Sequence, residues 1–152
     1  MLLVVFVGCA PTARSAGPFA AKGRAAAHAV HSAVASDLLV IEATHRGHVT
    51  AAYVSVATSE AEDSGSQAAS TFLSIQPPDE DSQRLRDDLS DLFTFAEDAL
   101  GQARIAGRRW DNDALFAVEA NLQTIDAQLS NAANGEAFDI DQLSSSSSES
   151  AG

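Results

Sequence analysis

Cysteine and lysine are nearly absent from this chain of 152 residues, because each occurs only once, as Cys9 and Lys22. A single cysteine excludes a disulfide bond within the chain, so a fold formed outside the cell would depend on side-chain packing alone. Long apolar runs are also missing, and none approaches the roughly 20 residues that cross a bilayer as a helix. The sequence therefore contains no transmembrane helix.

Basic residues are scarce, with 9 Lys and Arg against 21 Asp and Glu and a net charge of −12. Nucleic acids and anionic lipid headgroups bind proteins through clustered cations, so this balance argues against both as general partners. The chain also lacks the Gly-x-Ser-x-Gly, phosphate-loop and dinucleotide-binding patterns that place a nucleophile or hold a phosphate. We expect a protein that is not an enzyme, needs no cofactor and binds no nucleic acid.

Proline is infrequent as well, and between residues 19 and 134 it occurs only as the pair Pro77-Pro78. Alanine dominates this region, and no alternation of apolar and polar residues predicts a strand. Over residues 79–108 and 112–133, apolar side chains recur every three or four positions, which is typical of helices that pack in a bundle. The pattern predicts an all-α protein.

An apolar stripe also runs through the first half of the chain, at Val30, Val34, Leu38, Ile41, Val49, Tyr53 and Val56. At about 1.5 Å per residue, a single helix there would be roughly twice as long as either later helix. We therefore predict a break at Gly47, because glycine favours the left-handed conformation that ends helices. The chain then divides into four segments of similar length, 20–45, 50–75, 79–108 and 112–133. These lengths predict an antiparallel up-down-up-down four-helix bundle, and the alternative is a three-helix bundle with one long first helix.

The N-terminal apolar run ends in Phe6-Val7-Gly8-Cys9, next to the only cysteine. This segment resembles the lipobox of bacterial lipoproteins, in which a signal peptidase cuts before the cysteine and the thiol carries a diacylglycerol. The resemblance implies lipid attachment at Cys9 and a location on the extracytoplasmic face of the cell membrane. Secretory signals usually open with basic residues, and here none precedes Arg14. We therefore interpret residues 1–8 as a truncated lipoprotein signal peptide.

Three short segments, at residues 74–78, 84–89 and 103–109, are similar to small α-helical lipoproteins of high-GC Gram-positive bacteria. They read Ser-Ile-Gln-Pro-Pro, Arg-Leu-Arg-Asp-Asp-Leu and Ala-Arg-Ile-Ala-Gly-Arg-Arg. The resemblance covers roughly residues 30–130 and contains no chemical motif. It implies a location and a fold, and it implies no activity.

Composition divides the chain into four parts. After the signal peptide, residues 9–18 contain Pro and Gly among small side chains and form a predicted flexible tether. Residues 19–135 form the helical bundle domain. Residues 136–152 end in a run of serines with acidic residues, and we predict a disordered tail because such a segment has little to bury.

Histidine is the one residue type that suggests metal chemistry. Glu42-x-x-His45 has the spacing found in di-iron carboxylate bundles, and His48 follows after three further positions. Imidazole and carboxylate groups together suit a transition metal. A metal-binding or metal-sensing bundle using Glu42, His45 and His48 is therefore the alternative function. The simpler interpretation is that both histidines satisfy carbonyl groups at a helix end.

The predicted topology brings the turns near residues 46–49 and 108–111 to one end of the bundle. That end would collect Arg46, Arg104, Arg108, Arg109 and Trp110. Arg and Trp are enriched among the residues that dominate binding interfaces. We predict that this tip contacts an envelope protein or an anionic cell-wall polymer. Alternatively, each Arg only complements a helix C-terminus and Trp110 packs on the next helix.

Together these features predict a lipid-anchored protein outside the cytoplasmic membrane. Its function would be that of a non-enzymatic binding module in the cell envelope, with the membrane contacted through lipid on Cys9.

Overall fold

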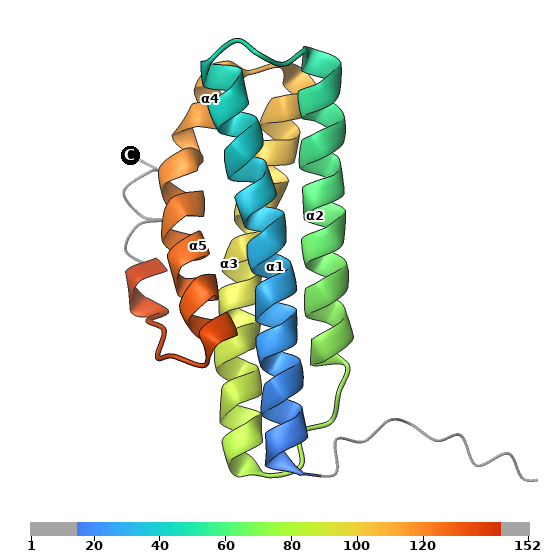
Figure 1. Ribbon diagram of the computed structural model, residues 1–152, viewed down its shortest axis with the longest axis vertical. Coiled ribbons are helices and arrows are strands. Elements are labelled where there is room, and N and C mark those ends of the chain that lie inside the picture. Colours follow the sequence, from blue (N-terminus) through green and yellow to red (C-terminus); the bar gives the residue numbers. More distant parts are fainter. Residues whose placement is uncertain (1–14, 144–152) are drawn as a thin grey trace, which may run out of the picture.

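The computed structural model describes residues 15–143, and within this range the chain forms five helices and no strand (Figure 1). The helices are α1 (Ala16–His45), α2 (Ala51–Leu73), α3 (Glu80–Arg109), α4 (Asn112–Ala117) and α5 (Glu119–Asn134). Each predicted helical segment is confirmed as helical, so the all-α prediction is confirmed. None of the helices in residues 15–143 combines the length and the hydropathy needed to cross a membrane.

The long helices lie side by side along the long axis of the molecule (Figure 1). Helix α1 packs against α2, α3 and α5, while α3 packs against α2, α4 and α5. The connection between α1 and α2 lies at the same end as α4, and the connection between α2 and α3 lies at the opposite end. Helices α1 and α3 therefore form the centre of the packing, with α2 and α5 on either side of α1.

Helix α1 ends where the sequence predicts a break. Gly47 adopts a φ of +66°, which costs glycine little. The Thr50 side chain then accepts a hydrogen bond from the Tyr53 backbone N–H, 3.3 Å away, and caps α2. The alternative arrangement with one long first helix is therefore wrong.

The predicted fourth segment is interrupted once. At Val118 the backbone N–H bonds to the Phe116 carbonyl, two residues earlier, so the regular helical ladder stops between α4 and α5. Phe116 stacks against His45 of α1 with 3.6 Å between ring centroids. The sequence gives no glycine or proline at this point, which is why a continuous helix is the natural prediction.

Both flanking predictions need correction where the structure describes them. Helix α1 begins at Ala16, so the last residues of the predicted tether are helical. The first part of the predicted disordered tail is ordered, because Leu143 is fully buried and the Gln128 side chain accepts a 2.7 Å hydrogen bond from the Asp139 N–H. Apolar side chains in this segment provide surface to bury. The predicted signal peptide, Cys9 and the serine run lie outside the described residues.

Small residues set how closely the helices approach. A Cβ atom built on Gly107 of α3 would lie 2.9 Å from Thr58 Oγ1 and 3.2 Å from Val54 Cγ1, both on α2. Both neighbours are β-branched and therefore stiff. The absence of a side chain at this position lets α2 and α3 pack together.

We predict that Gly107→Ala destabilises the fold by about 1–3 kcal/mol, because overpacking outweighs the better helix propensity of alanine. Chemical denaturation monitored by circular dichroism measures the change. Gly17→Ala is the matched control, since its added Cβ would meet nothing within 4 Å. Because Gly17 lies in the first turn of α1, that substitution should change stability by no more than about 0.5 kcal/mol. Equal effects of the two substitutions would contradict the proposed close approach.

Candidate functional site

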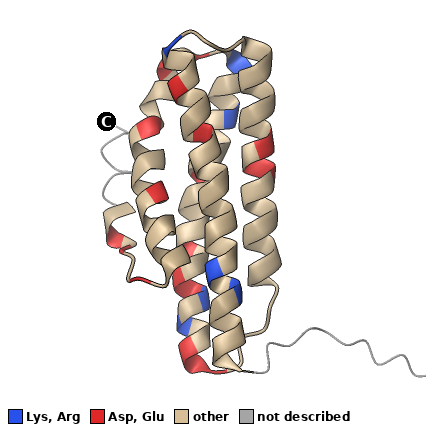
Figure 2. Cartoon of the chain, in the orientation of Figure 1, with Lys and Arg blue, Asp and Glu red and all other residues tan. Residues whose placement is uncertain are grey.

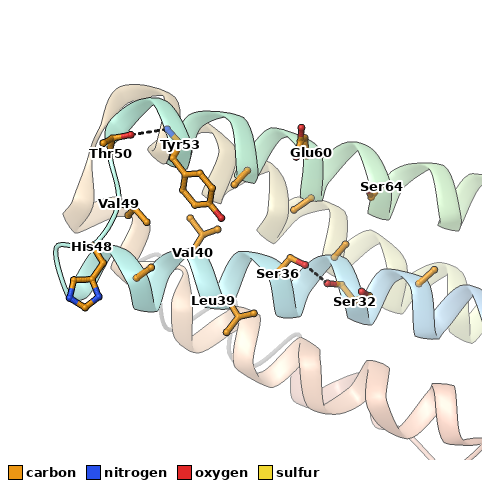
Figure 3. Close-up of a pocket in the computed structure, with 15 residues that line it drawn as sticks. Ser32, Ser36, Leu39, Val40, His48, Val49, Thr50, Tyr53, Glu60 and Ser64 are labelled. Atoms are coloured by element: carbon orange, nitrogen blue, oxygen red, sulfur yellow. Dashed lines mark hydrogen bonds between the residues drawn. The ribbon is translucent and has the colours of Figure 1, made fainter.

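A groove with a volume of about 760 Å³ runs along the outer surface between α1 and α2 (Figure 3). Buried side chains of Ala33, Val40 and Ala61 lie at its base. The remaining lining includes Ala29, Ser32, Ser36 and Leu39 from α1, and Tyr53, Ala57, Glu60 and Ser64 from α2. We refer to this feature as the α1–α2 groove.

Small side chains at helical spacing produce the groove. On α1 the positions Ala29, Ser32 and Ser36 follow at three and four residues, so they share one face of the helix. The Ser36 hydroxyl donates a 2.8 Å hydrogen bond to the Ser32 carbonyl, which satisfies its polar hydrogen within the helix. The surface between the helices is therefore hollow, and polar as well as apolar side chains line it.

Three large apolar side chains are exposed on α1 and α2, and two of them line this groove. Leu39 is 72% exposed, Tyr53 is 55% exposed and Val56 is 56% exposed. Leu39 and Tyr53 line the groove near the connection between α1 and α2, where Figure 3 shows the Tyr53 ring extending toward α1. Single exposed apolar residues are ordinary, but a cluster beside a groove is typical of an interaction surface.

A second hollow of about 720 Å³ continues the groove toward the start of α1. The two hollows share Ala29 and Ser64. The second extends to Lys22 on one side and Ile75 on the other. The continuous depression therefore follows almost the whole length of α2.

A buried carboxyl group lies at the helix interface below this surface. Asp37 of α1 is fully buried, and neither of its oxygens has a hydrogen-bond partner among the described residues. Burial, and then the nearby charge of Glu62 on α2, raise the pKa of Asp37 to about 8. Glu62 itself pairs with Arg104 of α3. Neutral Asp37 is therefore the form that the folded protein favours at pH 7.

We predict that Asp37 makes the folded protein less stable as pH rises. Its folded pKa lies above the unfolded value of 3.8, so the folded state holds an extra proton between about pH 4 and pH 8. Stability should fall across that window by up to about 1.4 kcal/mol per pH unit. Denaturation at several pH values measures this slope.

Asp37→Asn should remove most of that slope, because the amide does not titrate. Asp63→Asn is the control, since Asp63 is an exposed acid on α2, and it should leave the slope in place. A slope that persists in Asp37→Asn would show that another group is responsible.

The predicted metal site is not assembled. Glu42 pairs with Arg46 at 2.5 Å, and His45 Nε2 lies 2.9 Å from Glu119 Oε2 on α5. Helix α1 ends at His45, so His48 lies beyond the helix. The three-residue spacing therefore does not put His48 on the same helix face as Glu42 and His45. Within residues 15–143, no group of three His, Cys, Asp or Glu side chains is arranged to hold a metal ion.

The predicted tip is only partly present. Arg108, Arg109 and Trp110 are exposed at one end, but Arg46 is paired with Glu42, and Arg104 is partly buried in its pair with Glu62. Acidic side chains occur at the same end, as Figure 2 shows. They include Asp111, Asp113 and Glu119. Two of the five predicted tip residues are therefore already paired with carboxylates, and acidic side chains accompany the others at this end.

Trp110 ends α3 in an unusual backbone conformation. Its φ of 53° is left-handed, the conformation that glycine usually supplies at this position. A side chain there costs roughly 1–2 kcal/mol. The Asp111 N–H nevertheless bonds to the Ala106 carbonyl at 3.0 Å, so the helix end is satisfied.

Sequence reasoning missed the groove because it assigned Tyr53 and Val56 to the buried stripe. It also placed Leu38 on that stripe in preference to Asp37, although Asp37 follows Val30 and Val34 by seven and three positions. That spacing was the available signal for a buried acid.

Comparisons of the chain with family models, with curated proteins and with solved structures find no match.

Proposed function

We propose that this chain is a non-enzymatic binding module, anchored by lipid on Cys9 at the extracytoplasmic face of the cell membrane. In this proposal the fold is an antiparallel up-down-up-down four-helix bundle in which α4 and α5 together form an interrupted fourth helix. The helix contacts support that arrangement, because α1 packs on α2 and α5 while α3 packs on α2, α4 and α5.

The α1–α2 groove supports the binding role through its exposed Leu39 and Tyr53. A partner that covers these side chains would bury apolar surface now in contact with water. A protein partner is favoured over an anionic polymer, because Arg46 and Arg104 already pair with carboxylates. The strongly acidic chain would repel a polymer of the same sign.

The anchor and the groove are compatible in position. Cys9 precedes Ser15, the first described residue, by six positions, so a lipid there would hold the end of the molecule where α1 begins. Leu39 and Tyr53 lie near the opposite end, beside the connection between α1 and α2 (Figure 3). The exposed apolar cluster would then face away from the membrane.

The anchor is tested by Cys9→Ser in a high-GC Gram-positive host. We expect the wild-type protein in the membrane fraction, with mass spectrometry showing a diacylglycerol thioether at an N-terminal Cys9. The variant should lose the modification and leave the membrane, while its melting temperature stays unchanged because the described helices span residues 16–134. Recovery of unmodified wild-type protein with Met1 retained would refute the anchoring.

A further inference from the structure

We infer that the α1–α2 groove binds an amphipathic helix that inserts an apolar ridge between α1 and α2 and places basic residues against α2. This inference rests on the proposed binding function and adds the chemistry of the partner. Shape, apolar anchors and charge each contribute to it.

The shape of the groove matches a helix. Lys22 and Ala43 lie at its two ends on α1, which are about 30 Å apart along the helix, the length of a helix of about 20 residues. Small side chains at its centre, Ala29 and Ser64, belong to both hollows. They allow a third helix to approach at the 8–10 Å axial distance of ordinary helix packing.

The apolar anchors lie at one end of the groove. Leu39 on α1 and Tyr53 on α2 both line it, and both are more than half exposed. Figure 3 shows the Tyr53 ring extending toward α1 and Leu39 on the side of α1 away from α2. Tyrosine is among the residues that contribute most to binding interfaces. Apolar side chains of the partner that contact Leu39 and Tyr53 would therefore supply much of the affinity.

The charge of α2 defines the partner further. This helix contains Glu60, Glu62 and Asp63 and no Lys or Arg. Glu62 is paired with Arg104, whereas Glu60 and Asp63 are exposed and form no ion pair with any side chain in residues 15–143. Figure 2 shows these acidic positions on the middle of α2 with no basic residue on that helix.

The two sides of the groove therefore differ. Glu60 is the only acidic residue that lines either hollow, and it comes from α2. The lining residues from α1 include no acid and only Lys22 as a cation, at the far end. A partner helix with cations on the flank that faces α2 complements this asymmetry, and the net charge of −12 increases its association rate.

Other occupants fit less well. A second copy of the chain would bring another acidic α2 toward Glu60 and Asp63. Residues 144–152 contain serines and one glutamate but no cation and no large apolar side chain. Residues 1–8 are apolar but contain no basic residue.

The inference is tested with two labelled synthetic peptides of about 20 residues, the length that fills the groove. Both are amphipathic helices with the same Leu and Ala ridge, and one carries Lys on its flank where the other carries Glu. Fluorescence anisotropy with the full-length protein should show binding of the Lys peptide at least about tenfold tighter than the Glu peptide. The preference should weaken as salt is raised.

Variants of the groove locate the binding. Leu39→Ser and Tyr53→Ser should each weaken binding of the Lys peptide by about tenfold. Ile105→Ser is the matched control, because Ile105 is an exposed apolar residue of α3 outside both hollows, and it should bind as the wild type does. Glu60→Lys combined with Asp63→Lys should reverse the preference toward the Glu peptide. Circular dichroism checks that each variant is folded.

The outcomes separate this inference from the function on which it rests. Groove-dependent binding of both peptides with equal affinity would overturn the basic partner and leave the binding module standing. Equal loss in Ile105→Ser, or no binding of either peptide, would remove the groove as a binding site altogether. A dimer in analytical ultracentrifugation that Tyr53→Ser dissociates would overturn the inference in favour of a second copy.

Discussion

The close approach of helices through small residues is the constraint on which the rest of this structure depends. Gly107 and Gly65 leave no side chain where α2 meets its neighbours, and an added Cβ at Gly65 would lie 2.9 Å from Leu100 Cδ1. With helices this close, large side chains such as Phe72 and Phe93 fill the interior. Binding is therefore expected at the surface, and the small residues that tighten the core also hollow the outer face between α1 and α2.

Asp37 is the exception within this tight core. A buried carboxyl without a hydrogen-bond partner among the described residues is costly even when neutral. Glu62 of α2, whose charge acts on Asp37, forms an ion pair with Arg104 that links α2 to α3. Burial and the charge of Glu62 both oppose ionisation of Asp37. Asp37 and Glu62 belong to α1 and α2, the two helices that form the groove.

The sequence predicts the helices well and their exposed faces poorly. Periodic apolar residues and the capping positions Asp79 and Asp111 define α3 and α4, and both caps are present. In α2, alanine and serine occur on every face, so periodicity does not distinguish Tyr53 at the surface from Val54 in the core. The spacing of His45 and His48 likewise does not predict that His45 pairs with Glu119 or that α1 ends at His45. The pairing depends on a contact between α1 and α5, which the local sequence does not specify.

Some helix faces are covered by other segments of the chain, and the face between α1 and α2 is not. This difference favours the α1–α2 face for binding. Helix α5 packs against α1 and α3, and the C-terminal segment lies near α3, where Asp88 adjoins Phe138, and bonds to Gln128 of α5. No described segment covers the surface between α1 and α2, so Leu39 and Tyr53 are exposed to water. Serine or glutamate at those two positions would avoid the cost of exposing apolar side chains to water, without disturbing the core. In the proposed function, a partner that covers leucine and tyrosine would remove their apolar surface from water.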